Sequence, residues 1–255
     1  MIWNSHLYLQ FERERTRAAR DLLAHIPNLN PRYIFDLGCG PGNSTALLVE
    51  AFPSAKTIGV DVSDEMLQVA QELVALAEFV KGDIANWCPN KPADLIFANA
   101  SLHFLLDHQT RLVQLVDSLE IDGVLAVQMP NNIHEVSHAL MRMIAADGPW
   151  ASRLVPIAKS QALVGSAEEY YELLAKSCKG LDIWQTTYVH PLANADEIVK
   201  WFEGSGLRPF LEALSFEEQR AFLARYRAEL AKVYPLQLDS KVLLRYPRLF
   251  IVARR

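Results

Sequence analysis

A glycine-rich segment carries the clearest chemical signal in the chain, DLGCGPG at residues 36–42. Its glycines allow the backbone to approach a ligand closely and to adopt dihedral angles that side chains disfavour. The helix expected directly after it would offer free N–H groups in its first turn. The glycine spacing is GxGxG, not the GxGxxG of dinucleotide sites, and the carboxylate of Asp36 would repel a pyrophosphate. The segment therefore predicts a ligand that carries an ammonium group.

Two further acids stand at the ends of predicted strands. Asp61 ends the strand expected at 56–61, about twenty residues after the glycines, where a carboxylate can accept both hydroxyls of a ribose. Asp83 ends the strand expected at 77–83, where it could accept from an adenine amino group. Each acid alone could equally be a helix cap or a solvated turn residue. Three acids in register with a glycine loop predict a nucleoside ligand at the carboxyl edge of a parallel sheet.

The elements that must position these residues follow from the hydrophobic pattern of the first half. Apolar segments of strand length alternate there with helical patterns, which is typical of a parallel sheet covered on both faces. The predicted strands are 33–37, 56–61, 77–83, 94–99 and 123–129, and the helices between them are 43–51, 64–76 and 107–119. The fold class predicted is therefore α/β.

The pattern changes after Met129, and no strand is expected between residues 130 and 165. Capping boxes that begin at Ser166 and Ser215 predict helices to about Cys178 and Tyr234. Further helices are predicted at 134–146 and 194–203, and further strands at 181–192 and 248–254. The predicted parts are a core with an N-terminal helix (1–129), a helical insertion with a return helix (130–180), and the last two strands with a helical cap insertion (181–255).

Composition excludes several classes of protein. The 255 residues include 25 basic and 30 acidic side chains, a net charge of −5, which argues against a nucleic-acid binder. No apolar run reaches the length of about 18 residues that a membrane span needs, and the N-terminus is too charged for a signal peptide. Cys39, Cys88 and Cys178 are widely spaced and form neither a disulfide framework nor a metal motif, so we expect a cytoplasmic protein without a metal.

These motifs resemble the class I S-adenosylmethionine-dependent methyltransferases. The matching segments are DLGCGPG (36–42), GVDVSDEML (59–67), KGDI (81–84) and ANASLHF (98–104). The chain is more closely similar to one family, the trans-aconitate methyltransferases, in WNSHLYLQFERERTR (3–17), DLIFANASLHF (94–104), GVLAVQMPNN (123–132), GLRPFL (206–211) and YPRLFIVARR (246–255). The resemblance implies a single domain with a Rossmann-like seven-stranded sheet, an antiparallel last strand and helical cap insertions.

The resemblance also implies the cofactor, S-adenosyl-L-methionine, with S-adenosyl-L-homocysteine as the product. The residues implied around it are Asp36, Gly38, Gly40 and Gly42 at the methionine moiety, Asp61, Val62, Met66, Asp83 and Ile84 at the ribose and adenine, and Asn99 and Ser101 beside the sulfonium. Tyr8, Gln10 and Arg17 resemble residues that close the cofactor pocket, although a plain amphipathic helix explains this segment equally well.

The reaction implied by the resemblance is methyl transfer to a carboxylate oxygen of trans-aconitate, a small tricarboxylate, by a monomeric enzyme. A carboxylic acid with a pKa of about 4 is already ionised at pH 7, so no catalytic base is expected. Cations that could hold the other carboxylates are Arg142, Arg153, Lys159, Arg208, Arg245 and Arg248. We favour Arg208 because it lies between Gly206 and Pro209, where the chain must turn. His103, Tyr170 and Arg248 are the other candidates for the substrate pocket.

Four alternatives remain open at this stage. A nicotinamide-dependent oxidoreductase would require the GxGxxG spacing, and a base-specific nucleic-acid methyltransferase would have a Pro-Pro-aromatic loop where this chain has NASLH (99–103). A methyltransferase for another small acid, or for an acyl-carrier-bound acid, would share the same core. A binding module without activity is possible but has no positive feature in the sequence.

Overall fold

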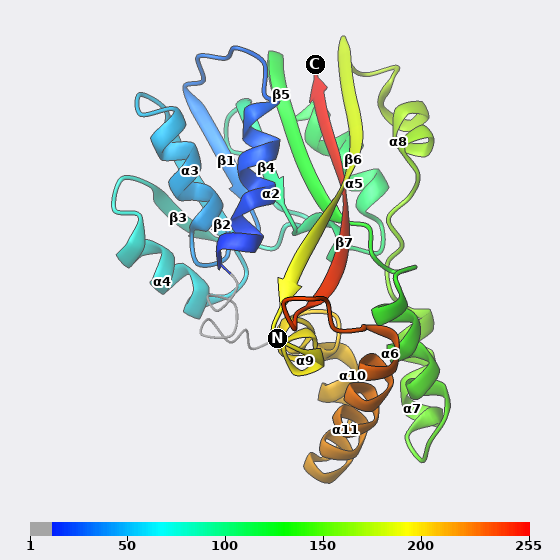
Figure 1. The fold of residues 1–255 in the computed structure, drawn as a ribbon. Helices are drawn as coiled ribbons and strands as arrows, with labels where there is room; N and C mark the ends of the chain where they lie inside the picture. The colour runs from blue at the N-terminus through cyan, green and yellow to red at the C-terminus, as the bar shows by residue number, and fades with distance from the viewer. Residues whose placement is uncertain (1–11) are drawn as a thin grey trace.

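The computed structural model describes residues 12–255, which form a seven-stranded sheet of order β3-β2-β1-β4-β5-β7-β6 (Figure 1). The strands are β1 (Tyr33–Leu37), β2 (Lys56–Asp61), β3 (Glu78–Lys81), β4 (Ala93–Asn99), β5 (Leu119–Pro130), β6 (Gly180–Leu192) and β7 (Val242–Arg254). The first five strands pair in parallel, and β7 runs antiparallel to both β5 and β6. The predicted α/β class, the seven strands and the antiparallel last strand are confirmed.

Alternate residues of the central strands pack on opposite faces of the sheet, which places the helices in two layers. Ile34 belongs to an apolar cluster with α2 (Glu12–Ala24) and α3 (Asn43–Ala51). Its neighbour Phe35 belongs to a cluster with α5 (His108–Asp117) and α8 (Ala167–Leu174). In Figure 1, α2 and α3 lie in front of the sheet and α5 lies behind it. The helix α4 (Asp64–Leu73) contacts β2 and β3 at one edge.

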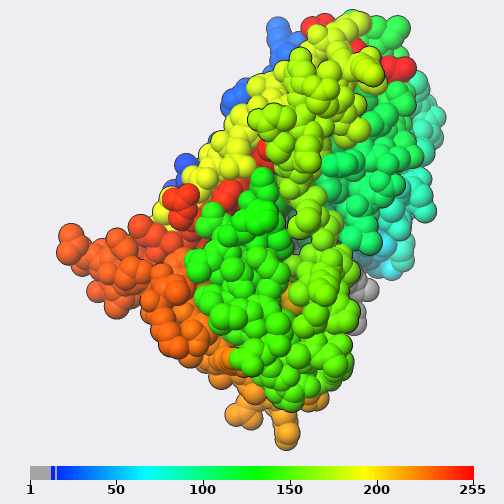
Figure 2. Space-filling view, turned by 90° about the vertical axis from the view of Figure 1, so that its right-hand side faces the viewer, coloured from blue at the N-terminus to red at the C-terminus, as the bar shows by residue number. Residues whose placement is uncertain are grey.

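The remaining helices form a separate lobe, which we call the cap. It consists of α6 (Val136–Ala146), α7 (Ala151–Lys159), α9 (Ala195–Glu203), α10 (Arg208–Glu212) and α11 (Phe216–Val233). These helices share one apolar cluster, in which Trp201 and Tyr226 are fully buried. Figure 2 shows the green atoms of the first insertion packed against the orange atoms of the second, below the sheet. The two insertions, far apart in sequence, therefore build one lobe.

Local sequence signals account for most helix boundaries and fail at two helices. Ser166 and Ser215 each form the predicted capping box, with the side chain of Glu169 or Glu218 bonded back to the cap. The helices α7 and α10 were not predicted from the sequence. α7 contains Pro156, and α10 has only 5 residues with a proline in its first turn, where the missing N–H has no helical partner to lose. Within residues 12–255, no helix is long and apolar enough to cross a membrane.

Candidate active site

A cavity of about 760 Å³ lies between the carboxyl edge of the sheet and the cap. Its sheet side is formed by residues that follow β1, β2, β3 and β4, among them Gly40, Asp61 and Asn99. Its cap side is formed by residues from α6, α7 and the turn between α9 and α10, among them His138 and Gly206. The cavity therefore has one wall from the glycine-loop motif and one wall from the insertions.

The three glycines of the loop all have positive φ angles but serve different purposes. At Gly40 (φ 54°) an added Cβ would meet no atom within 4 Å, so the loop leaves open space in the cavity at this position. At Gly38 (φ 70°) an added Cβ would lie 2.3 Å from the Cβ of Ser101, so the glycine permits close packing of two loops. Gly38 also lines the cavity.

Gly42 does not line the cavity among the described residues, which corrects its expected contact with the cofactor. It precedes α3 with a φ of 93°, and an added Cβ would lie 3.2 Å from both Ala70 and Val74 of the α4 segment. Its role is therefore in helix packing, although its position in the motif had suggested a ligand contact.

Asp36 is fully buried at the base of the glycine loop. Its Oδ2 accepts hydrogen bonds from the hydroxyls of Ser44 (2.7 Å) and Thr45 (2.6 Å). Its Oδ1 is buried and has no hydrogen-bond partner among the described residues. Burial raises the pKa of Asp36 to about 6, against the partial compensation of the two hydroxyls. A buried carboxylate in this state would be stabilised by a cationic ligand group beside the loop.

Asp61 links the glycine loop to the start of α4. Its Oδ2 accepts from the backbone N–H of Gly40 (3.0 Å), and its Oδ1 accepts from that of Ser63 (2.9 Å). Each oxygen keeps a second lone pair, so the carboxylate can still accept from a ligand at the cavity wall. Asp83, whose Oδ1 accepts from the N–H of Ala85 (3.0 Å), lies on the same wall. The apolar residues implied at the nucleoside also line the cavity, namely Val62, Met66 and Ile84.

The segment after β4 forms the floor of the cavity. Ser101 donates its hydroxyl to the carbonyl of Leu37 (2.7 Å), while the Oδ1 of Asn99 is buried without a partner among the described residues. His103 lies in the short 3₁₀ turn η1 (Leu102–Phe104) and lines the cavity. Burial, with a contribution from the Arg248 charge, lowers the pKa of His103 to about 3. The imidazole is therefore neutral at physiological pH.

The residues proposed for the substrate fall into two groups. His103 lines the cavity, whereas Arg208, Arg248 and Tyr170 are not among its described lining residues. Arg208 begins α10 beside Pro209, which does line the cavity, and its guanidinium pairs with Glu212 at 2.8 Å. Arg208 is therefore engaged by an acid of its own helix, contrary to its expected role as the first carboxylate anchor.

Arg248 and Tyr170 are both buried and are not among the described lining residues, although the Arg248 charge lies close enough to affect the lining residue His103. The guanidinium of Arg248 donates to the side chain of Gln128 (2.8 Å) and lies 4.7 Å from the ring centre of Tyr246, a lining residue. The hydroxyl of Tyr170 is shared between His108 (2.7 Å) and the N–H of Gly165 (3.0 Å) in the sheet core. Tyr170 therefore serves the packing of α8, and its expected contact with substrate is not carried further.

The expected closure of the pocket by the N-terminal segment concerns three residues. Tyr8 and Gln10 lie outside the described residues. Arg17, on α2, is exposed, and its guanidinium lies 4.9 Å from the ring centre of Tyr188 on β6. Among the described residues Arg17 does not line the cavity, and its expected contact with the cofactor carboxylate stays a prediction.

Sequence reasoning missed several lining residues of the cap wall. Asn132, His138, Gly206 and Tyr246 line the cavity, yet none of them was a predicted site residue. They come from the insertions and from β7, which meet only when the cap helices assemble. Asn132, Gly206 and Tyr246 do lie in the family-like segments 123–132, 206–211 and 246–255, but a resemblance of a whole segment does not show which of its side chains face the cavity.

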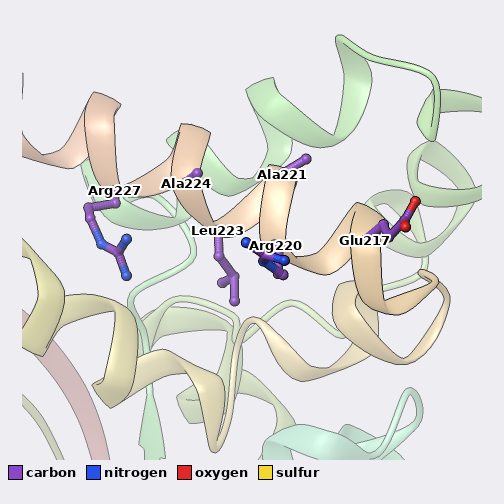
Figure 3. A pocket seen from close by; sticks show the side chains of 6 residues that line it. All are labelled: Glu217, Arg220, Ala221, Leu223, Ala224 and Arg227. Atoms are coloured by element: carbon purple, nitrogen blue, oxygen red, sulfur yellow. The ribbon is translucent and has the colours of Figure 1, made fainter.

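A second, shallower hollow lies on the outer side of α11 (Figure 3). Its lining residues all come from this one helix, as Figure 3 shows, and they include Glu217, Arg220 and Arg227. Arg227 already pairs with Asp196. The hollow contains none of the residues predicted to bind cofactor or substrate, so the larger cavity is the candidate site. Nor does the described part of the chain gather three or more histidine, cysteine or acidic side chains around a possible metal position.

The larger cavity fits the cofactor implied by the resemblance. The open space beside Gly40 can receive a ligand against the backbone, and the unpartnered Oδ1 of Asp36 calls for a cationic group. The carboxylate of Asp61 stands at the position suited to a ribose. The same cavity extends from these residues to the cap wall, where an acceptor molecule could bind beside the cofactor.

Comparison with known proteins gives the same assignment. Residues 34–123 match the family described as a methyltransferase domain. A trans-aconitate 2-methyltransferase of Rhodopseudomonas palustris (strain BisB5) is 48% identical over 98% of both chains. One of Yersinia pseudotuberculosis is 49% identical over 98% of this chain and 97% of its own.

Solved structures share the fold at low sequence identity. The YcgJ protein of Bacillus subtilis superposes with a TM-score of 0.59 at 14% identity, covering 94% of this chain and 98% of its own. A phosphoethanolamine N-methyltransferase of Haemonchus contortus, solved with S-adenosyl-L-methionine, gives a TM-score of 0.54 at 16% identity, over 94% of this chain and 52% of its own.

Proposed function

The chain belongs to the trans-aconitate 2-methyltransferase family, and on that premise we propose that it methylates a carboxylate oxygen of trans-aconitate with S-adenosyl-L-methionine as the methyl donor. One observation supports this function above the others. A single cavity joins a wall suited to a nucleoside and an ammonium group to a cap wall that contains polar residues. The similarity to the relatives extends over 98% of this chain, so it spans the segments that form both walls.

The chemistry requires little of the protein beyond positioning. S-adenosyl-L-methionine supplies an activated methyl group on its sulfonium when it is bound. The residues that fit it are Asp36, Gly38, Gly40, Asp61, Val62, Met66, Asp83, Ile84, Asn99 and Ser101. The acceptor is a carboxylate that is ionised at neutral pH, so no side chain has to remove a proton from it. The cap excludes water and holds the acceptor oxygen towards the floor formed after β4.

His103 fits the role of a neutral hydrogen-bonding group on that floor. Its Nδ1 is buried and has no partner among the described residues, and its pKa of about 3 keeps the ring uncharged. An uncharged imidazole can orient a carboxylate without forming an ion pair that would reduce the nucleophilicity of the oxygen. The residue is thus suited to positioning the substrate, while proton transfer is not required.

We expect a flat pH profile for the methyl transfer step. With the pKa of His103 lowered to about 3 by burial, its protonation state does not change between about pH 6.5 and 8. The substrate carboxylates are also fully ionised in this range. The measurement is kcat and kcat/KM for trans-aconitate at saturating S-adenosyl-L-methionine. A sigmoid rise with a midpoint near pH 7 would contradict this mechanism and indicate a catalytic base.

The proposed substrate is tested by assaying methyl-ester formation with trans-aconitate, cis-aconitate, citrate and isocitrate. We expect trans-aconitate to give the highest kcat/KM, and a small acid outside this set, or an acyl-carrier-bound acid, to be the alternative acceptor. Activity on such an alternative acceptor, with none on trans-aconitate, would disprove the proposed substrate. The assignment as a carboxylate methyltransferase would still stand. Titration with NAD tests the alternative of a nicotinamide-dependent oxidoreductase, and we expect the protein not to bind NAD.

Asp61→Ala is expected to weaken the binding of S-adenosyl-L-methionine by roughly 1.5–3 kcal/mol, the contribution of hydrogen bonds to a charged partner. The variant also frees the N–H groups of Gly40 and Ser63, so the loop loses one of its hydrogen bonds to β2, while those from Gly38 and Cys39 to Val60 remain. Asp61→Asn keeps one acceptor and should fall between the variant and the wild type. Calorimetry on folded protein measures this, and unchanged affinity in Asp61→Ala would disprove the ribose assignment.

We propose further that the enzyme acts as a cytoplasmic monomer on a free small molecule, without a nucleic-acid partner. The net charge of −5 supports the last point, since phosphate backbones are bound by basic surfaces. Cys39, Cys88 and Cys178 are free thiols, which suits a reducing compartment. Both walls of the cavity come from one chain. Sedimentation equilibrium at micromolar concentration tests the monomer, and a dimer would reject it.

A further inference from the structure

Arg142 is an incompletely compensated cation beside His138; it is not itself among the described lining residues, but its charge acts on that lining histidine. It lies on α6, one helical turn after His138, and its Nη1 is buried with no hydrogen-bond partner among the described residues. Side chains on a helix tilt towards its N-terminus, so the guanidinium leans over the turn that carries His138. A buried guanidinium nitrogen without an acceptor is unfavourable unless a ligand supplies one.

Three other arginines of the cap each form a salt bridge, which Arg142 does not do among the described residues. Arg153 pairs with Glu218, Arg208 with Glu212, and Arg225 with Asp147. For Arg142 the described part of the chain offers no carboxylate within salt-bridge distance. The cap thus balances the charge of these three arginines and leaves that of Arg142 for something outside the described chain.

His138 connects Arg142 to the cavity. Its ring lines the cavity wall, and its Nε2 lies 3.0 Å from the position that a Cβ would take on Gly206, another lining residue. Burial, with a contribution from the Arg142 charge, lowers the pKa of His138 to about 3, so the ring is neutral and can donate one hydrogen bond. Glycine at position 206 therefore allows this ring to pack directly against the backbone of the cavity wall.

We propose that His138 and Arg142 form a carboxylate-binding subsite on the cap side of the cavity, which takes a substrate carboxylate that is not methylated. The inference rests on the proposed function, because it names the residues that distinguish a polycarboxylate from a simple acid. The guanidinium presents two parallel donors to a carboxylate, and the histidine adds a third from the cavity wall. His138 of the subsite and His103 of the floor line the same cavity.

The test is calorimetric titration of trans-aconitate, fumarate and glutaconate into the enzyme saturated with S-adenosyl-L-homocysteine. Each of the two dicarboxylates lacks one carboxyl-bearing group of trans-aconitate. We expect Arg142→Gln to weaken the binding of trans-aconitate about tenfold or more, and Arg142→Lys to recover only part of it. A dicarboxylate that lacks the carboxylate held by Arg142 should bind the variant and the wild type alike, and weakened binding of both dicarboxylates would assign Arg142 to the carboxylate on the CH carbon, which both retain. In turnover assays the KM should rise more than kcat falls.

Arg220→Gln is the matched control, since it removes the same charge from an exposed position of the cap, on α11. It should leave all three affinities unchanged, which separates the subsite from a long-range charge effect. S-adenosyl-L-homocysteine affinity and thermal midpoint should be unchanged in Arg142→Gln, which separates the subsite from a folding defect. His138→Ala should reproduce the loss for trans-aconitate.

The possible results distinguish failure of the carboxylate subsite from failure of the proposed methylation of trans-aconitate. Equal binding of trans-aconitate by the wild type and Arg142→Gln overturns the subsite while the methylation of trans-aconitate stands. Polycarboxylate binding that depends on Arg142, without methylation of trans-aconitate, supports the subsite and overturns the proposed substrate. Absence of binding by all three acids to the wild type overturns both.

Discussion

Gly40→Val is expected to abolish the binding of S-adenosyl-L-methionine in a protein that still folds. An added Cβ at Gly40 meets no protein atom within 4 Å, so the valine side chain would project into the cavity and occupy the space of the ligand. The positive φ of 54° adds a strain of about 1–2 kcal/mol for a residue with a side chain. Calorimetry should detect no binding, and circular dichroism should detect the native secondary structure with a lower midpoint.

Two companion variants separate ligand exclusion from destabilisation. Gly180→Val, at the start of β6, introduces the same side chain where an added Cβ also meets no atom within 4 Å and φ is not positive, so binding should be unchanged. Gly38→Ala brings its Cβ to 2.3 Å from that of Ser101, so this variant should lose stability even without ligand. Tight binding by folded Gly40→Val would mean that the loop has only a structural role.

Asp36→Asn should stabilise the ligand-free protein at pH 8 and weaken its binding of the cofactor. The folded-state pKa of about 6 lies above the ordinary aspartate value of 3.8, so the charge of Asp36 opposes folding at pH values above 3.8, and the penalty is complete above pH 6. The difference corresponds to on the order of 3 kcal/mol. Asparagine can still accept from Ser44 and Thr45 without carrying the buried charge.

The gain in stability should fade as the pH falls from 6 to 4, because the wild-type carboxyl then becomes neutral in the folded state. Cofactor binding should change in the opposite direction. Wild-type affinity should rise with pH through 6, as the carboxylate becomes available to an ammonium group, and the variant should lack this rise. Urea unfolding and calorimetry between pH 4 and 8 measure both quantities. An equal pH dependence of affinity in both proteins would remove Asp36 from the cofactor site.

The sheet and its nucleoside wall could be predicted from the sequence because both depend on local patterns. β1 and β2 have the predicted bounds, and the residues beside Gly40 and Asp61 meet because parallel strands share a carboxyl edge. A glycine requirement is also local, although the motif could not reveal that Gly42 faces α4 instead of the ligand. In this half of the molecule, the spacing of residue types is sufficient to predict the strands and the cavity wall at their carboxyl ends.

The substrate wall could not be predicted in the same way. Whether an arginine is free to bind a ligand depends on which acid stands beside it after folding. Glu212 is four residues from Arg208, yet the pair was recognisable only once α10 was seen to be a helix. Tyr170 was a candidate for the substrate pocket, but the face of α8 on which it lies is decided by packing against α5. The pairing of Arg208 thus depends on a helix that the sequence did not predict, and the orientation of Tyr170 depends on a tertiary contact.

The shared apolar cluster of the cap has a consequence for the evolution and engineering of such enzymes. Its helices come from two stretches of sequence that are separated by β6, and each stretch contributes side chains to the same interior. Exchange of one stretch alone between relatives would leave a lobe whose two halves do not fit. A change of acceptor by recombination therefore requires that both stretches move together, whereas the nucleoside half can remain in place. Selection for a new substrate is then expected to act on the pair as one inherited unit.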